Sequence, residues 1–278
     1  MPSHLSLDDA FWRVLPNVFA FDGGRYLVGV ALMMTVLWIA HRTGLKARII
    51  QDRRAGRADY RRETLTSLRS VAIYALVATP SVWLQSNGYV VGDRSGHASP
   101  LTVALFVVLL LVAHDAYFYW THRAMHDPRL FKRWHRTHHR SVTPTPFAAY
   151  AFDWREAIVQ AAFVSIWICL VPTPFIAMFI FLGIMIVRNV MGHSGTELHP
   201  RGWADHPILG LINTTVHHDL HHSGGFNYNY GLYFTWWDRL MGTEHPRYRE
   251  VFREVTARDR KGYSPAKNPR TAALNAAG

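Results

Sequence analysis

Histidines gather in one short stretch of this sequence, which runs from His122 to His139 and reads HRAMHDPRLFKRWHRTHH. The stretch holds five of the chain's seventeen histidines, at positions His122, His126, His135, His138 and His139. Residues three or four apart share one face of a helix, so this spacing predicts imidazoles that converge on a small volume. Imidazole is the commonest protein ligand for transition metals, so the stretch predicts a metal site.

A second triplet with the same spacing follows much later in the chain, at His218, His221 and His222, with an isolated His193 before it. Nine imidazoles exceed what one metal ion needs, whereas two ions with four or five ligands each use them all. The spacing lacks the H-E-x-x-H pattern of zinc proteases and the E-x-x-H pairs of carboxylate di-iron bundles. Histidine ligands suit Zn, Cu, Fe and Ni alike.

Apolar runs predict the elements that must position these histidines. Tyr26–Ala40, Leu65–Leu84 and Leu101–Trp120 are candidate membrane helices, the first of them short. Two shorter runs, Ala157–Val171 and Phe175–Val187, are joined by a proline-containing link and predict a hairpin that enters only part of the bilayer. The runs predict an integral membrane protein with three to four transmembrane helices and a short membrane hairpin.

The charge of the loops predicts which side of the membrane the histidines face. The net charge is +11, and nine Lys or Arg residues lie between Arg42 and Arg69, whereas Gln85–Pro100 contains only Arg94. Cytoplasmic loops are rich in Lys and Arg, so the first loop and all the histidine clusters are expected at the cytoplasm. Because apolar segments flank the basic loop, we expect a membrane contact there and no nucleic-acid partner.

The ends of the chain and its one cysteine add little chemistry. The polar start MPSHLSLDDAFW does not resemble a signal peptide, so we expect a retained membrane segment after it. Pro16 and Gly23–Gly24 are expected to break any helix before Tyr26. Cys169 is expected to be a small buried hydrophobe. We expect one membrane domain over 1–278, made of N-terminal helices with a basic loop (1–100), a histidine core (101–245) and a polar tail (256–278).

The histidine motifs HRAMH, HRTHH and HDLHH stand in an order that resembles the fatty acid hydroxylase/sterol desaturase superfamily of membrane di-iron oxygenases. The resemblance extends to DAYFYWTHR at 115–123, GHSGTE at 192–197, FNYNYG at 226–231 and WDRLMGT at 237–243. It covers roughly residues 100–245.

The resemblance implies an all-α fold in which a cytosolic helical cap over the membrane helices holds two metal ions. It also implies an enzyme that uses two non-haem Fe ions and O2 to hydroxylate or desaturate a lipid such as a fatty acyl chain or a sterol. Zinc is able to replace iron during purification. Two electrons must come from a separate donor (a reductase, ferredoxin or cytochrome), because the chain shows neither an iron–sulfur cysteine cluster nor a dinucleotide fingerprint. The implied ligands are His122, His126, His135, His138, His139, His193, His218, His221 and His222. The additional His217 either replaces His218 as a ligand or is its neighbour, and the sequence leaves this open.

Carboxylates near these histidines are expected to orient their rings. Asp115 lies seven residues before His122, on the same helical face, and is expected to accept a ring N–H. Asp219 and Glu197 are candidates for the same task. Two other functional classes stay open: a di-zinc membrane hydrolase or lyase that needs no O2, and a non-catalytic metal carrier or haem protein. The sequence also leaves open the lipid, the choice between hydroxylation and desaturation, and the oligomeric state.

Overall fold

The computed structural model describes residues 5–90, 98–223 and 226–258. Over these residues the fold is helical, and the extended pairings are limited to two isolated β-bridges, Ile49 with Thr196 and Ile212 with Phe234. The prediction of an all-α protein is therefore confirmed.

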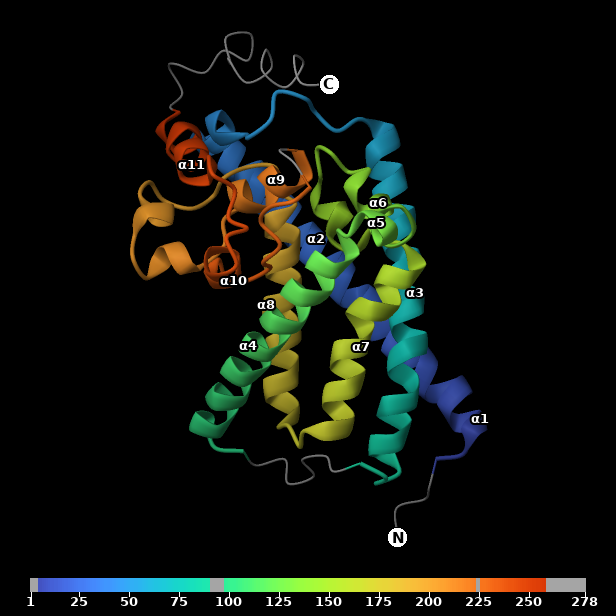
Figure 1. Cartoon of the computed structure of the whole chain (residues 1–278). Coiled ribbons are helices and arrows are strands. Elements are labelled where there is room, and N and C mark those ends of the chain that lie inside the picture. The colour runs from blue at the N-terminus through green and yellow to red at the C-terminus, as the bar shows by residue number, and fades with distance from the viewer. Residues whose placement is uncertain (1–4, 91–97, 224–225, 259–278) are drawn as a thin grey trace.

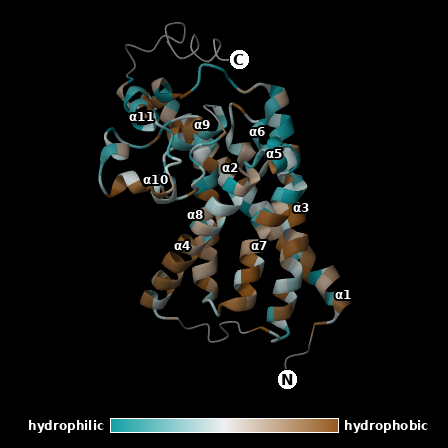
Figure 2. Cartoon of the chain, in the orientation of Figure 1, coloured by the Kyte–Doolittle hydropathy of each residue, from teal (hydrophilic) through white to brown (hydrophobic). Residues whose placement is uncertain are grey.

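Long helices form a bundle below the histidine residues. They are α2 (Leu15–Thr43), α3 (Arg57–Ser86), α4 (Pro100–Met125), α7 (Trp154–Leu170) and α8 (Phe175–Gly192). Helix α3 packs against α2 and α7, while α8 packs against α2 and α4. The bundle carries its apolar residues mainly over its lower part, and hydrophilic residues gather at the opposite end (Figure 2).

Four helical segments are long and apolar enough to cross a membrane: Leu7–Thr43, Arg57–Ser86, Pro100–Met125 and Phe175–Gly192. The expectation of three to four membrane helices is confirmed. Both arms of the predicted hairpin were expected to be short. This is wrong for the second arm, α8, which continues five residues beyond Val187. The helix continues through polar residues because these residues form hydrogen bonds at its C-terminal end. The Arg188 guanidinium donates to the carbonyl of Asn213, and the carbonyl of Asn189 accepts from a ring nitrogen of His193.

The first membrane helix also starts earlier than expected. A short α1 (Leu7–Asp9) and a π-helical turn η1 (Ala10–Val14) lead directly into α2. Pro16 does not break it, because this residue lies in the first turn of α2, where a missing N–H costs little. Gly23 lies against α3, where a Cβ would be 3.7 Å from Val71, so it serves helix packing and does not end the helix.

Short helices build a cap at one end of the bundle (Figure 1). They are η2 (Leu45–Arg48), α5 (Pro128–Trp134), α6 (Arg136–His139), η3 (Pro146–Tyr150), η4 (Trp203–Asp205), η5 (Leu209–Leu211), α9 (Thr215–Ser223), α10 (Trp236–Leu240) and α11 (Tyr248–Ala257). The loop between α2 and α3 lies at the same end (Figure 1). The first two residues of the expected polar tail, Thr256 and Ala257, complete α11, and residues 259–278 lie outside the described part of the chain.

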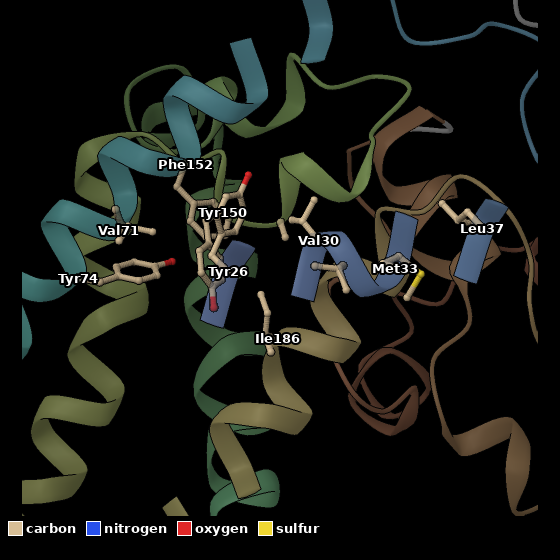
Figure 3. Close-up of a cluster of buried hydrophobic side chains, with 12 residues drawn as sticks. Tyr26, Val30, Met33, Leu37, Val71, Tyr74, Tyr150, Phe152 and Ile186 are labelled. Carbon is tan, nitrogen blue, oxygen red and sulfur yellow. The ribbon is translucent and has the colours of Figure 1, made fainter. Parts of the chain in front are cut away.

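An aromatic core joins the bundle to the cap. Tyr150 of η3 stacks on Tyr26 of α2 at 5.4 Å between ring centroids and meets Tyr74 of α3 edge-on at 5.1 Å. Phe152 follows directly and belongs to the same buried cluster (Figure 3). The cluster fixes the segment after the second histidine motif against two membrane helices.

Candidate metal centre

The structure brings all nine predicted ligands together in two groups. The first group is His122, His126, His135, His139 and His221, and the second is His138, His193, His218 and His222. Within each group, every residue offers a ring nitrogen, and these nitrogens all lie within 4.8 Å of one another. All nine side chains are buried. Two adjacent sites with five and four imidazoles match the count expected for a dinuclear centre.

Each of the last two histidine motifs is divided between the groups. His135 and His139 point into the first group and His138 into the second, while His221 joins the first and its neighbour His222 the second. The rings of His221 and His222 are 5.7 Å apart. Consecutive histidines therefore link the groups and hold them next to each other.

Local sequence sets the direction of the first two motifs. Helix α4 ends at Met125 with His126 as its cap, and Asp127 then caps α5 by accepting from the backbone N–H of Arg129. His135 stands at the junction between α5 and α6, with φ of −130°. The spacing of the second motif suggested one continuous helix. The helix is instead interrupted at His135, and this interruption turns His135 back toward α4.

Backbone carbonyls assign the hydrogen on several of the imidazoles. Nδ1 of His122 lies 2.8 Å from the carbonyl oxygen of Tyr230, and Nδ1 of His193 lies 2.7 Å from the carbonyl oxygen of Asn189. A carbonyl only accepts, so each of these nitrogens carries the hydrogen, and Nε2 of a neutral ring then presents a bare lone pair. His221 is oriented in the same way by the carbonyl of Tyr228 at 2.7 Å.

Ring nitrogens face one another inside the groups. Nε2 of His122 lies 2.9 Å from Nε2 of His135, and Nε2 of His218 lies 3.1 Å from both Nε2 of His193 and Nε2 of His222. Several lone pairs at this separation repel unless a positive charge lies between them. The donor set therefore fits metal cations, and neutral imidazole nitrogen is the form that binds them.

Burial keeps the histidines in that neutral form. It lowers the pKa of His193 to about 4 and, with the neighbouring His122, the pKa of His126 to about 2. Burial first, and the neighbouring histidines second, hold the pKa of His138 and His221 well below the usual range. The centre is thus ready to bind metal at neutral pH without losing protons.

The two C-terminal motifs support the histidines through one loop. The carbonyls of Tyr228 and Tyr230 orient His221 and His122, as described above. The buried Asp238 holds this loop by accepting from the backbone N–H groups of Tyr230 and Gly231, each at 2.9 Å. Asn229 between the tyrosines adopts a left-handed conformation, φ 60°, and its amide donates to the carbonyl of His217.

His217 itself stays outside both groups. Its ring is fully buried, with Nε2 3.5 Å from a carboxylate oxygen of Asp238 and its edge against Tyr248. His218, and not its neighbour, therefore joins a group that could hold a metal ion.

The three carboxylates expected beside the ligands have other partners. Asp115 accepts from the backbone N–H of Tyr233 and from the indole N–H of Trp236, at 3.0 and 2.7 Å, and so anchors the C-terminal loop to α4. The prediction that Asp115 bonds a ligand ring is therefore wrong. Asp115 lies on the predicted helical face, but its oxygens accept hydrogen bonds from the cap loop at Tyr233 and Trp236 instead.

Glu197 and Asp219 likewise hold the cap together. Glu197 accepts from the N–H groups of His199 and Val216, at 2.9 and 2.8 Å, and the second bond satisfies the start of α9. Asp219 accepts from the side-chain amide of Gln51 at 2.8 Å, which ties α9 to the basic loop. Both residues position the helix that carries the third motif.

Sequence reasoning missed the carboxylate that does meet a ligand. Oε1 of Glu156, in the first turn of α7, lies 2.8 Å from Nδ1 of His135, and both side chains are buried. The available signal was a single acidic residue at the start of an apolar run, since a buried acid usually requires a partner.

An apolar cavity of about 350 Å³ lies between α2, α3, α4, α7 and α8. Its lining includes Phe118, whose ring is 5.0 Å from that of His122, and Phe152, whose ring is 5.0 Å from that of His138. At one end, the aromatic rings of Phe118 and Phe152 therefore separate the cavity from the two histidine groups, while the rest extends between the membrane helices. This arrangement suits a lipid whose body lies in the bundle and whose reacting carbon lies near the histidines.

Comparison with known proteins agrees with this geometry. Residues 107–243 match the model of the family described as fatty acid hydroxylase. The chain is 30% identical over 258 residues to a Delta(7)-sterol 5(6)-desaturase (erg3B) of Aspergillus fumigatus, covering 90% of this chain and 73% of that protein. It is 32% identical to lathosterol oxidase of Mus musculus, covering 66% of this chain and 61% of the relative.

The human lathosterol oxidase is 34% identical over 49% of this chain and 44% of its own length. The chain thus spans only part of each of these relatives. No solved structure matches the chain. Similarity to a sterol desaturase over nine tenths of the chain, together with the matched histidine core, shows that the chain belongs to the fatty acid hydroxylase/sterol desaturase superfamily.

Proposed function

We propose that this protein is a membrane oxygenase that uses two iron ions, O2 and two external electrons to hydroxylate or desaturate a lipid. Its family and its relatives support an oxidoreductase of this kind. The relatives are named for sterols, which favours a sterol-like lipid over a simple acyl chain. The observation that carries the proposal is the pair of buried histidine groups whose ring nitrogens face one another, one aromatic ring away from an apolar cavity.

In this proposal the five-histidine group holds one ion and the four-histidine group the other. Bound iron supplies the O2-dependent oxidation of a C–H bond, which zinc cannot perform. The protein's part is to orient the ligands. The carbonyls of Tyr230, Tyr228 and Asn189 hold Nδ1–H and so direct Nε2 inward. Oε1 of Glu156 lies 2.8 Å from Nδ1 of His135, and beside a bound cation its ionised carboxylate would orient that ring and add negative charge.

The cavity supplies the second requirement, which is a dry and fixed position for the substrate. Phe118 and Phe152 separate the histidines from the lipid body and keep water from the approach. Which hydrogen is removed then depends on how far the lipid enters the cavity.

We also propose that the cap faces the cytoplasm, where a separate electron carrier delivers the two electrons. The basic loop and the histidine cap lie at the same end of the bundle (Figure 1), and loops rich in Lys and Arg stay on the cytoplasmic side.

The test is anaerobic reconstitution of the purified full-length protein with Fe(II), with iron and zinc quantified. Lathosterol and a lipid extract are then supplied with reductant, an electron carrier and O2, and products are identified by mass spectrometry. We expect a lipid that gains one oxygen or loses two hydrogens, with a dependence on both iron and O2.

A matched pair of histidine variants locates the activity. His138→Ala removes one ligand of the four-histidine group and should abolish turnover and lower the bound iron. His206→Gln changes an exposed histidine of the cap and should behave as the wild type. Turnover supported by zinc without O2 would contradict the proposal in favour of a hydrolase or lyase.

A further inference from the structure

Polar atoms without partners face the apolar cavity at a distance from the histidines. Asp22 and Arg25 of α2 form an ion pair at 2.6 Å, with only 11% and 9% of their side chains exposed, and both line the cavity. A charge pair within a membrane helix is costly and usually marks a functional site.

The pair does not satisfy itself completely. Nη2 of Arg25 is used by Asp22, and Nη1 donates to the carbonyl of Leu182 at 3.2 Å, which leaves the buried Nε without a partner. The ion pair with Asp22 and the bond from α2 to α8 account for the two Nη atoms of Arg25, but they leave its Nε without a role.

Two other elements bring further unpaired groups to the same cavity. The hydroxyl of Tyr150, a residue only 1% exposed, has no hydrogen-bond partner, and the Arg25 guanidinium carbon lies 5.9 Å from the centroid of its ring. Nε2 of Gln160, on α7, is also unpaired and lines the cavity. All three groups can donate a hydrogen bond, and a buried donor without a partner destabilises the fold.

We propose that Arg25, Tyr150 and Gln160 form a polar subsite that binds a neutral oxygen, a hydroxyl or ketone, on the lipid that occupies the cavity. Donors call for an acceptor such as an oxygen atom. Asp22 already balances the charge of Arg25, so a neutral oxygen fits better than a carboxylate. This inference rests on the proposed function, because it assumes that the cavity holds the lipid substrate.

The subsite also sets the depth at which the lipid binds. Gln160 follows Glu156 by four residues and so lies about 6 Å below it along α7. Leu182, which holds Arg25, precedes His193 by eleven residues, or about 16 Å along α8. The oxygen is therefore held one to three helical turns from the histidines, and the reacting carbon lies several bonds away from it.

Binding of matched lipids to the full-length protein in nanodiscs tests the subsite without any turnover. The probes are cholestanol and cholestane, which share one ring body and differ by a hydroxyl, and octadecanol with octadecane as the chain pair. We expect the wild type to bind the alcohol of at least one pair about tenfold more tightly than its hydrocarbon.

Tyr150→Phe removes only the hydroxyl and keeps the ring stacking, so it should reduce that preference to about twofold, and Gln160→Leu should act in the same direction. Tyr117→Phe is the matched control, because the Tyr117 hydroxyl donates to the carbonyl of Val159 and does not line the cavity. It should keep the wild-type preference.

Equal binding of alcohol and hydrocarbon by the wild type would overturn the subsite, as would a preference that survives both Tyr150→Phe and Gln160→Leu. Tighter binding of stearic acid than of octadecanol would replace the neutral oxygen by an anionic one and so contradict the proposal. Because no iron, O2 or electron donor enters this measurement, a failed oxidation assay and a failed subsite give separate results.

Discussion

At the scale of single residues, the centre depends on what holds the far side of each imidazole. Carbonyls do so for His122, His193 and His221, whereas His135 has the carboxylate of Glu156 2.8 Å from its Nδ1. A carbonyl fixes which nitrogen carries the hydrogen, whereas a carboxylate also makes the ring a stronger donor to a cation. His135 is therefore the ligand whose strength is most open to a single substitution.

Glu156→Gln tests this role. Burial raises the pKa of Glu156 well above its usual range, so its charge beside Nδ1 of His135 depends on a bound cation. The amide preserves the shape but cannot ionise, so we expect a 10–100-fold loss in metal affinity or in iron-dependent turnover. Retention of iron during titration with a chelator measures the first quantity. Glu250→Gln is the control, since that exposed carboxylate pairs with Arg247 on the cap surface. Iron retention equal to the wild type would show that the carboxylate does not support the ligand.

At the scale of elements, the cavity and the centre depend on how closely the membrane helices approach. The contact of α2 with α8 is closest at Gly29, where an added Cβ would lie 2.6 Å from Cγ1 of Ile186. Helix α8 carries His193 directly after its last turn. Any change that moves α8 away from α2 therefore displaces a ligand of the second group.

Gly29→Val should separate these two helices. Overpacking of this kind costs about 1–3 kcal/mol in the free energy of unfolding, so we expect a lower thermal unfolding midpoint and a reduced iron content. Gly24→Val is the matched control on the same helix, because a Cβ there meets nothing within 4 Å.

Ile186→Ala in the Gly29→Val background should recover part of the loss by removing the clash. A midpoint equal to the wild type in Gly29→Val, or a loss as large in Gly24→Val, would show that this contact does not limit the packing.

At the scale of the whole molecule, the cap is built around buried neutral histidines. Eight of the nine ligands lie outside the membrane-spanning segments, and each has a pKa below the ordinary value of 6.5, with burial as the largest cause. When a folded-state pKa is depressed, the unfolded chain binds more protons at low pH, so stability is complete above pH 6.5 and is lost as the pH falls.

The metal-free protein should therefore have a constant thermal unfolding midpoint between pH 7 and 8 and a steep decrease between about pH 6.5 and 5. Asp238 and Glu156 act in the opposite direction, since burial raises the pKa of Asp238 to about 6 and that of Glu156 well above its usual range, but they are two groups against eight histidines. Iron should dissociate over the same range, because protons compete for the ligand nitrogens. A midpoint that stays constant down to pH 5 would contradict the expected burial of the histidines.

Much of this protein could be predicted from local sequence. Residue type and spacing predict the nine candidate ligands, their order and the long apolar helices. A ligand needs a particular side chain, and a membrane helix needs a particular length. The two C-terminal motifs were found as a resemblance, but their task was not. Their carbonyls and Asp238 support histidines that lie up to about a hundred residues away.

Only the tertiary structure decided how the ligands divide and what surrounds them. His138 and His139 are neighbours in the sequence yet join different groups, since the turn at His135 and the packing of α9 set the direction of each ring. Asp115 had the right spacing for a ligand partner and still bonds the loop at Tyr233, while Glu156 meets His135 across 21 residues. Spacing defines a face of one helix, but a partner on another element is chosen by packing, which sequence periodicity does not encode.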